Sequence, residues 1–364
     1  MPAHSAPSPR RSGTGAAAGL RALVVAACAV AALATEPAAA AEPVFPAREW
    51  QGADPAAAGW SPAKLKLAEA FAREIGSTAV LIVAEGRAIA SWGDVARRVR
   101  VNSVRKSVLS ALYGIAVAEG RIDLARTLRD LGIDDKPPRL TEAEKTATVR
   151  DLLRARSGVY HEAAAEPQSM KERRPERGSH APGTFWYYNN WDFNVLGTIY
   201  RTLAGEDIFA AVERRIARPI GMQDFTAADG KSVLSRVSVH PAYHMDFSAR
   251  DLARFGWLYL NGGRWEGRQV VPAAWVAEST QPLSDAGPGI GYGYMWWPSK
   301  ADMHRNVKVG PGTYSARGFG GQFLMVAPSR GLVVSHLAAD RLPEKGEERL
   351  LKLIMEAAPK PARR

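Results

Sequence analysis

The chain has 364 residues, 46% of them hydrophobic, which is enough apolar material for a large buried core. Its formal net charge is +11, but the densest basic runs, residues 96–100 and 171–180, contain no interleaved aromatic residues and match no nucleic-acid-binding motif. We therefore interpret these runs as solvated loops and expect no nucleic-acid partner.

Residues 1–40 have the pattern of a cleaved export signal. Arginines precede an apolar run over residues 22–34, which is shorter than the roughly 20 residues of a membrane-spanning helix. Small residues follow, as a signal peptidase requires, so we expect cleavage after Ala40. The mature protein should then be secreted or periplasmic, with no stable membrane insertion. The alternative is an Ala-rich leader that is never cleaved.

The only cysteine, Cys28, lies inside this apolar run. The stretch "VAAC" is loosely similar to a lipoprotein cleavage site, but too few apolar residues precede Cys28, and the run continues beyond it. We therefore do not expect lipidation. Cleavage would remove Cys28, which excludes a disulfide framework, a cysteine nucleophile and a thiolate metal site from the mature protein.

The first expected element of the mature chain is an amphipathic helix over residues 61–77. Ser61 suits the N-cap, Pro62 suits the first helical position, and Gly76 suits the end. One face carries the apolar residues Leu65, Ala68, Phe71 and Ile75. Ser61 and Lys64 have Ser-x-x-Lys spacing, but the helix start accounts for both residues.

Residues 78–93 then read as a β-hairpin with its turn at 85–87, and a second helix follows in the stretch "VNSVRKSVLSALYG". Its apolar face is wide, as in a buried helix, and Gly120 suits its end. The apolar positions are Val104, Val108, Leu109, Leu112, Ile115 and Ala116. Ser103 and Lys106 therefore stand at the start of a helix that we expect to be buried.

Helical patterns interrupted by loops dominate residues 121–240, and strands return near the C-terminus. The helical segments are residues 141–156, 191–205, 207–221, 248–263 and 272–280, with a polar loop over about 161–182. A hairpin over 321–339 and a helix over 345–358 close the chain. This order predicts an α+β fold, in which an antiparallel sheet is flanked by the N- and C-terminal helices and carries an inserted, mostly helical region.

Ser103 and Lys106 are a candidate nucleophile and base. A serine hydroxyl reacts when a base removes its proton, and residues three apart on a helix share a face, so Lys106 can reach Ser103. Burial and nearby positive potential lower a lysine pKa from its reference value of about 10.4, which this role requires. The unpaired N–H groups at the helix start can donate to an oxyanion. The spacing alone also fits a capping serine followed by a surface lysine.

Two further patterns follow in order. The stretch "FWYYNNWDFNVLG", residues 185–197, contains Tyr-x-Asn before an apolar run, and "RGFGGQFLMVAP", residues 317–328, places a glycine turn on a strand. Together with Ser-x-x-Lys, these patterns resemble the serine β-lactamase and penicillin-binding-protein family. The chain is similar to the class C-like esterase and amide-hydrolase branch of that family, which includes 6-aminohexanoate-dimer hydrolases, over roughly residues 60–355.

The resemblance implies a β-lactamase/transpeptidase-like fold and a serine hydrolase that forms an acyl-enzyme. Ser103 would be the nucleophile, and Lys106 its base or proton partner. Tyr188 would pass the proton to the leaving group and later activate water. Asn190 would contact the substrate amide or Lys106; the alternative is that it simply forms a turn.

Two other tyrosines, Tyr187 and Tyr259, also fit Tyr-x-Asn. We choose Tyr188 because its distance in sequence to Gly197 matches the branch. Tyr259 lies late in an amphipathic helix, where packing accounts for it. No separate deacylation glutamate motif of the class A type is present, so Tyr188 would serve both steps.

The same resemblance assigns the oxyanion hole to the backbone N–H groups of Ser103 and Phe319, beside Gly318. On this strand, β-lactamases and DD-peptidases carry Lys or His, then Thr or Ser, then Gly, whereas this chain has Ala316, Arg317 and Gly318. The cation that usually engages the carboxylate of a β-lactam or peptide is missing from its position. Arg317 should point to the other face of the strand. We therefore favour a neutral ester or amide substrate.

No cofactor or metal site is expected. His240 and His244 are four residues apart, but Pro241 makes a regular helix across them unfavourable, and no acidic metal motif accompanies them. His161 can line the pocket, although an ordinary loop histidine is the simpler interpretation.

The sequence thus predicts a signal peptide over residues 1–40 and one serine hydrolase domain over 41–364. The α/β part would span about 60–100 and 240–364, and the helical part about 101–240. The expected substrate is a small-molecule ester or amide, cleaved by a carboxylesterase or a 6-aminohexanoate-dimer-hydrolase-like amidase. The alternatives are a β-lactamase or DD-peptidase acting on β-lactams or cell-wall peptides, and a non-catalytic cell-wall peptide binder.

Overall fold

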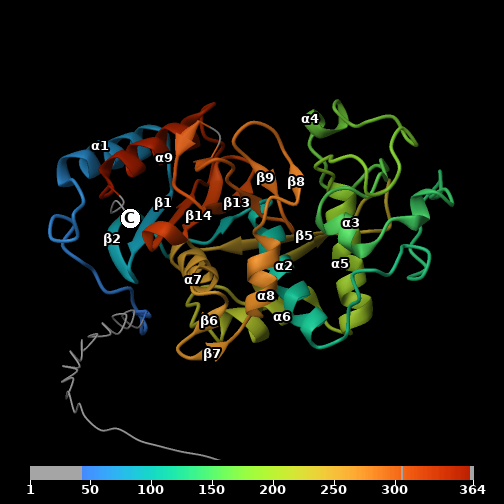
Figure 1. Ribbon diagram of the computed structural model, residues 1–364, viewed down its shortest axis with the longest axis horizontal. Coiled ribbons are helices and arrows are strands. Elements are labelled where there is room, and N and C mark those ends of the chain that lie inside the picture. The colour runs from blue at the N-terminus through green and yellow to red at the C-terminus, as the bar shows by residue number, and fades with distance from the viewer. Residues whose placement is uncertain (1–42, 305, 361–364) are drawn as a thin grey trace, which may run out of the picture. The chain divides into compact units, whose positions relative to one another are not determined.

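The computed structural model describes residues 43–304 and 306–360 (Figure 1). These residues lie in one compact unit, Pro43–Arg364. The expected signal peptide, including Cys28, lies outside the described residues. Within these two ranges, no helix combines the length and the apolar character that a membrane crossing requires.

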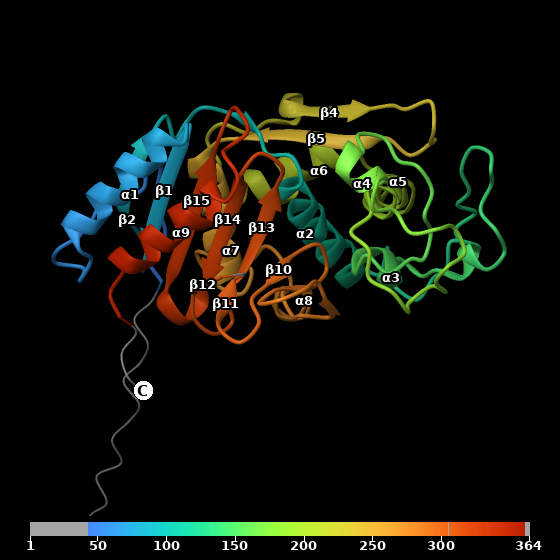
Figure 2. The ribbon, with the colours of Figure 1, turned by 90° about the horizontal axis from the view of Figure 1, so that it is seen from above.

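The largest sheet among the described residues has six antiparallel strands in the order β10-β13-β14-β15-β1-β2 (Figure 2). These strands are β1 (Ala79–Ala84), β2 (Arg87–Gly93), β10 (Trp297–Pro298), β13 (Tyr314–Gly318), β14 (Gln322–Ala327) and β15 (Leu332–Leu337). The first hairpin pairs directly with the last strand, since Ala79 lies opposite Leu337. Both predicted hairpins are present, and segments far apart in the sequence build one sheet.

Helices cover both faces of this sheet, as Figure 2 shows. α1 (Pro62–Glu74) and α9 (Gly346–Ala357) pack on one face, and α7 (Ala249–Leu260) packs on the other. Alternate residues of β1 join the two hydrophobic clusters, because side chains along a strand point to opposite faces. Val80 and Ile82 join the cluster with α1 and α9, and Ala79, Leu81 and Val83 join the cluster with α7. The predicted α+β class is confirmed.

A second group of helices contains α2. Its members are α2 (Val104–Ala118), α3 (Val149–Leu153), α4 (Gln168–Lys171), α5 (Asn190–Ala204) and α6 (Ile208–Val212), with the short 3-10 or π helices η1 (Glu144–Thr146), η2 (Glu213–Ala217) and η3 (Ala227–Asp229). The helical pattern of residues 141–156 forms η1 and α3 rather than one helix. Thr148 starts α3 through a capping box, in which its hydroxyl accepts from the Asp151 N–H and the Asp151 carboxylate accepts from the Thr148 N–H.

A smaller sheet of β3 (Val99–Arg100), β5 (Ala242–Phe247) and β4 (Gly230–Val233) includes residues for which we expected helices and loops. Val99 pairs with Phe247, so this sheet holds the chain just before α2. The remaining elements are α8 (Ala273–Ser279), η4 (Pro328–Arg330), β6 (Arg264–Trp265), β7 (Arg268–Gln269), β8 (Ser284–Asp285), β9 (Gly291–Tyr292), β11 (Met303–His304) and β12 (Val307–Lys308).

Candidate active site

Ser103 lies in a sharp turn between β3 and α2. The preceding residue, Asn102, has a φ of 48°, a conformation that is uncommon outside glycine, and its side-chain amide donates to Phe319 O at 2.7 Å. Ser103 is the N-cap of α2, but its side chain makes no capping hydrogen bond. Ser61, in contrast, caps α1 by accepting from the Lys64 N–H. The two Ser-x-x-Lys sequences therefore place their serines in different environments.

Lys106 joins three other residues that the sequence singled out. It is 1% exposed, and its Nζ lies 2.7 Å from Ser103 Oγ, 2.8 Å from Tyr188 OH and 3.0 Å from Asn190 Oδ1. The Asn190 side chain is fixed at its other end, because Nδ2 donates to Ala165 O at 2.9 Å. The structure therefore brings Ser103, Lys106, Tyr188 and Asn190 into one hydrogen-bonded group.

The pKa values of Lys106 and Tyr188 are shifted in opposite directions. Burial, assisted by the charge of Arg105, lowers the pKa of Lys106 well below its usual range. Burial raises the pKa of Tyr188 to about 12, although its hydrogen bond with Ser103 and the Arg105 charge act in the opposite direction. An amine that gives up its proton more readily than an ordinary lysine thus lies beside a phenol that keeps its own, which is a suitable arrangement for general acid–base chemistry.

The end of β13 lies directly against the turn that holds Ser103. A Cβ on Gly318 would lie 2.3 Å from Val101 O and 3.2 Å from Ser103 N, so the space admits only glycine without a shift. Phe319 follows and accepts the hydrogen bond from Asn102 at its backbone oxygen. The two backbone segments assigned to the oxyanion hole are therefore neighbours in the fold.

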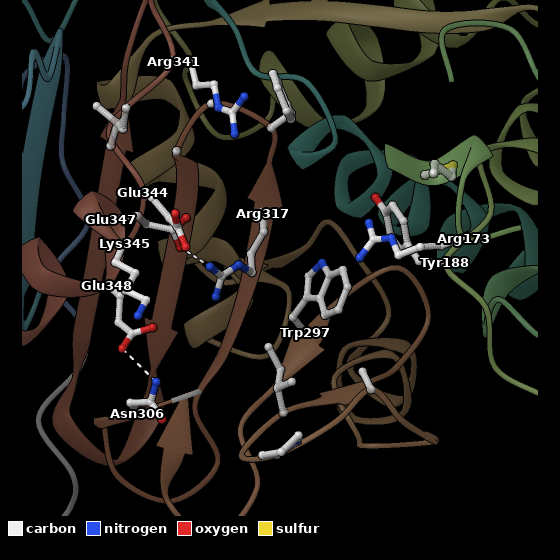
Figure 3. A pocket seen from close by; sticks show the side chains of 18 of the residues that line it. Arg173, Tyr188, Trp297, Asn306, Arg317, Arg341, Glu344, Lys345, Glu347 and Glu348 are labelled. Carbon is white, nitrogen blue, oxygen red and sulfur yellow. Dashed lines mark hydrogen bonds and ion pairs between the residues drawn. The ribbon is translucent and has the colours of Figure 1, made fainter. Parts of the chain in front are cut away.

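The two residues before Gly318 place no cation beside Ser103 and Lys106. Ala316 is fully buried, and the Arg317 guanidinium forms an ion pair with Glu347 of α9 and contacts His304. In Figure 3 the Arg317 side chain extends toward Glu347, and Trp297 lies between Arg317 and Tyr188 in this view. The charge of Arg317 is thus paired with a carboxylate of α9.

A cleft of about 1110 Å³ extends from Tyr188 and Phe319. One wall is aromatic: the ring centroid of Trp297 lies 5.3 Å from that of Tyr188 and 6.1 Å from that of Trp186. The cleft is also lined by charged residues, several of which belong to α9 or the segment before it: Arg173, Arg317, Arg341, Glu344, Lys345, Glu347 and Glu348 (Figure 3). The cleft can therefore accommodate a molecule with both an apolar and a polar part.

The other sequence candidates have ordinary structural roles. The Tyr187 hydroxyl donates to Met170 O of α4 at 2.7 Å, and Tyr259 is buried, with its ring centroid 4.6 Å from that of Trp296. His161 is buried, and both of its ring nitrogens contact backbone oxygens. Among the described side chains, no group of three or more His, Cys, Asp or Glu could hold a metal ion.

Sequence reasoning missed Arg105 and the aromatic wall. Arg105 belongs to the Ser-x-x-Lys stretch and is 3% exposed. The available signal was its position among the apolar residues of a helix that we expected to be buried. Trp297 belongs to the stretch "GYGYMWW", in which nothing marks a contact with Tyr188.

Comparison with known proteins places this geometry in context. The family model described as Beta-lactamase matches residues 31–358, which is most of the chain. No curated protein sequence matches the chain significantly.

Several solved structures share the fold. A Bacillus anthracis protein described as "Putative 6-aminohexanoate-dimer hydrolase" has 20% identity and a TM-score of 0.61, over 80% of this chain and 82% of that chain. A family VIII carboxylesterase has 17% identity and a TM-score of 0.61, over 82% and 98%. A penicillin-binding-protein homologue from Caulobacter crescentus has 17% identity and a TM-score of 0.57, over 81% and 97%. At these identities the likeness concerns the fold.

Proposed function

This chain belongs to the beta-lactamase family, and we propose that it is an exported serine hydrolase that cleaves an ester or amide bond through an acyl-enzyme on Ser103. The observation that carries the proposal is the buried Lys106 amine, hydrogen-bonded to Ser103, Tyr188 and Asn190. Lys64, which follows the capping serine of α1, is exposed, and its Nζ contacts a backbone oxygen of α9 instead. A lysine placed only to follow a helix cap does not require the contacts of Lys106.

The proposed acylation uses the protons already described. Lys106, whose lowered pKa favours the neutral amine, accepts the proton of Ser103 Oγ while that oxygen attacks the substrate carbonyl carbon. Tyr188 gives its proton to the leaving alcohol or amine and regains one from Lys106, at 2.8 Å. The N–H groups of Ser103 and Phe319 would hold the oxyanion. Water activated by Tyr188 would then release the acid and restore Ser103.

A neutral ester or amide fits the chain better than a substrate with a carboxylate beside the reacting bond. Ala316 occupies the position at which β-lactamases carry a cation, and Arg317 is paired with Glu347. The aromatic wall around Trp297 offers apolar contact near Tyr188, where the leaving group departs. The names of the carboxylesterase and of the Bacillus anthracis protein support the same substrate classes.

Covalent labelling tests the nucleophile. Incubation with a fluorophosphonate should add one adduct to the intact mass of the protein, and Ser103→Ala should remove that adduct. Ser61→Ala is the matched control, because Ser61 has the same Ser-x-x-Lys spacing and caps α1, and it should label normally. An unlabelled wild-type protein, or a labelled Ser103→Ala variant, would refute the proposal.

A β-lactamase or DD-peptidase is the second candidate, and one observation favours it. The Arg341 guanidinium lies 5.1 Å from the centroid of the Phe319 ring and lines the cleft, where a cation can meet a carboxylate. Turnover of p-nitrophenyl esters, 6-aminohexanoate dimers and nitrocefin distinguishes the candidates. Fast nitrocefin hydrolysis would reverse our order, and saturable muropeptide binding without turnover would indicate a non-catalytic binder.

Export is tested separately by the N-terminal sequence of the protein recovered outside the cytoplasm. Cleavage after Ala40 predicts a mature chain that begins at Ala41. Recovery of the uncleaved chain from the cytoplasm alone would contradict this part of the proposal.

A further inference from the structure

Arg105 is a buried cation without a carboxylate partner among the described residues. It is 3% exposed, and its Nη1 donates to Asn102 O at 2.8 Å. Its guanidinium lies 5.1 Å from the centroid of the Tyr243 ring, and its Nε has no hydrogen-bond partner in the described part of the chain. The guanidinium of Arg105 is therefore held by one backbone carbonyl, that of Asn102, and by the face of the Tyr243 ring.

This arrangement is costly for the fold. Removing a guanidinium from water is unfavourable unless an opposite charge and a full set of hydrogen bonds replace the solvent. The contacts with Asn102 and Tyr243 provide only part of that replacement. Helix formation does not require an arginine here, since the buried positions one turn further along α2, Val108 and Leu109, are apolar. The position of Arg105 thus calls for a reason outside stability.

The elements packed around Lys106 supply further positive or neutral groups. Arg105 precedes Lys106 on α2, and the Tyr188 phenol, from the segment before α5, is hydrogen-bonded to Lys106. From β5, the Tyr243 ring lies 5.1 Å from the Arg105 guanidinium, and the charges of Arg105, Arg100 and Lys231 act on His244, the next residue of the strand. Burial, reinforced by those cations, lowers the pKa of His244 to about 4, so this ring is neutral at neutral pH.

The nearest carboxylate of β5 does not offset this charge. Asp246 is paired with Arg100 at 2.6 Å, and both of these side chains are partly exposed to solvent. On the opposite side, β13 presents the uncharged Ala316 and the Glu347-paired Arg317. Arg105 is therefore the buried charge that adjoins Lys106.

We propose that Arg105 is a positioning residue whose fixed charge keeps Lys106 in the neutral form that accepts the Ser103 proton. The inference rests on the proposed function, because it assigns Lys106 the role of base. Its hydrogen bond to Asn102 O also supports the strained turn that carries Ser103. The proton moves from Ser103 Oγ to Lys106 Nζ as the oxygen bonds to the substrate carbon, so Arg105 itself exchanges no proton.

The same charge acts on the acid of the pair. Arg105 opposes the burial that raises the pKa of Tyr188, and it assists the burial that lowers the pKa of Lys106. Loss of the charge would move both pKa values upward. The pH range in which the enzyme is active should therefore shift to higher pH, while Lys106 remains the base and Tyr188 the acid.

Two variants separate the charge from the hydrogen bond. Arg105→Gln removes the charge but keeps an N–H donor for Asn102 O, whereas Arg105→Lys keeps the charge. The measurement is the rate of fluorophosphonate labelling of Ser103 between pH 5 and pH 10, followed by intact mass. We expect the midpoint of the acidic limb to rise by about one unit or more in Arg105→Gln, with labelling roughly 10-fold slower at pH 7 and recovered at high pH. Arg105→Lys should keep a midpoint near that of wild type.

The possible outcomes discriminate between the inference and its premise. An unchanged midpoint in Arg105→Gln would overturn the role of the charge, and a pH-independent loss in both variants would show a merely structural role. If Arg105→Gln fails to fold by circular dichroism, Arg105→Met, which fills the site with an apolar chain, provides the same neutral comparison. If wild-type Ser103 is never labelled, the proposed function fails and the inference with it; normal labelling with an unmoved midpoint refutes the inference alone.

Discussion

At the scale of single residues, Tyr188 separates into a ring that packs and a hydroxyl that bonds to Lys106. The ring lies 4.8 Å from Phe193 and 5.3 Å from Trp297, measured between centroids, and the hydroxyl lies 2.8 Å from Lys106 Nζ. Tyr188→Phe should therefore keep the fold and lower kcat/KM for an ester substrate by about 10²–10⁴-fold, since a general acid–base group is lost.

The neighbouring tyrosine gives a matched control. Tyr187→Phe removes a hydroxyl that bonds to Met170 O, outside the group around Lys106, and should leave kcat/KM within a few-fold of wild type. Ester turnover and thermal unfolding of both variants provide the comparison. Equal losses in the two variants would mean that Tyr188 was chosen wrongly among the Tyr-x-Asn candidates.

Gly318 offers a test of the backbone beside Ser103. In Gly318→Ala the new Cβ would meet Val101 O at 2.3 Å, so β13 and the Ser103 turn must move apart. Displacement of one oxyanion donor typically costs about 10²–10³-fold in rate, and we expect a loss of that order in fluorophosphonate labelling or ester turnover. Gly52→Ala, where nothing lies within 4 Å of the new Cβ, should leave the rate unchanged. Wild-type labelling by Gly318→Ala would show that this strand end is dispensable.

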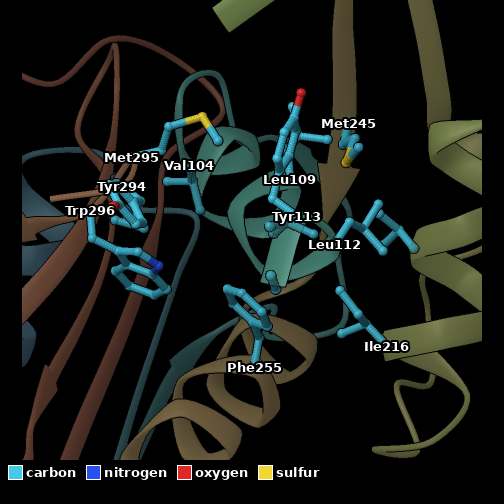
Figure 4. Close-up of a cluster of buried hydrophobic side chains, with 14 of the residues drawn as sticks. Val104, Leu109, Leu112, Tyr113, Ile216, Met245, Phe255, Tyr294, Met295 and Trp296 are labelled. Atoms are coloured by element: carbon cyan, nitrogen blue, oxygen red, sulfur yellow. The ribbon is translucent and has the colours of Figure 1, made fainter. Parts of the chain in front are cut away.

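At the scale of elements, α2 is held by packing on all sides. Figure 4 shows Leu112 of this helix in one buried cluster with Met245, Ile216 and Phe255, which come from three other elements. Leu112→Ala should lower the free energy of unfolding by about 2–5 kcal/mol, because a fully buried side chain leaves a cavity. Leu67→Ala on α1, where the side chain is 62% exposed, should change it by less than about 0.5 kcal/mol. Urea unfolding measures both, and similar values would contradict the buried position of α2.

The elements that sequence patterns predicted are those with local signals. α1, the two hairpins of the large sheet, α2, α5 and α9 have clear periodicity, caps or turn residues, and all of them are present. The sheet of β3, β5 and β4 was not predicted. β3 has two residues, which are too few to show alternation, and it pairs with Phe247 from a distant segment. β5 does alternate, with Tyr243 and Met245 buried and His244 between them less so, and this signal was missed.

The candidate site was predictable to a similar extent. The order of motifs and the family resemblance singled out Ser103, Lys106, Tyr188 and Asn190, but no spacing in one sequence gives the distances between residues on different elements. The burial of Arg105 was not predicted, because an arginine on a helix is usually at the surface, although the apolar pattern of α2 was a signal for it. Its burial follows from the strands and helices that enclose α2.

At the scale of the whole molecule, buried histidines connect stability to pH. His336 is fully buried; its Nδ1 donates to Gly321 O at 2.7 Å and its Nε2 accepts from the Ser77 hydroxyl at 2.8 Å. Burial lowers the pKa of His336 to about 4, although the hydrogen bond to Gly321 acts in the opposite direction. A depressed pKa means that the unfolded chain binds the proton more readily, so stability is full above about pH 6.5 and is lost as the pH falls toward 4.

The shift corresponds to roughly 3 kcal/mol of unfolding free energy across that window. Urea unfolding at several pH values should therefore show a decline from pH 6.5 to pH 4 that is flatter in His336→Gln. That variant should also be less stable at pH 7, because it loses the stacking of the ring on Phe323, at 5.0 Å between centroids. Parallel pH curves for the two proteins would show that His336 does not set this dependence.

The contact between Gly318 and the Ser103 turn joins two segments that the ribosome synthesises far apart in time. A ribosome that adds about 5–20 residues per second completes Ser103 roughly 10–40 s before it reaches Gly318. During that interval the turn lacks the strand end beside it, and β1 lacks its partner β15. The nascent chain therefore carries Ser103 and Lys106 without the strand that completes their surroundings, and chemical competence can arise only after nearly the whole chain has been made.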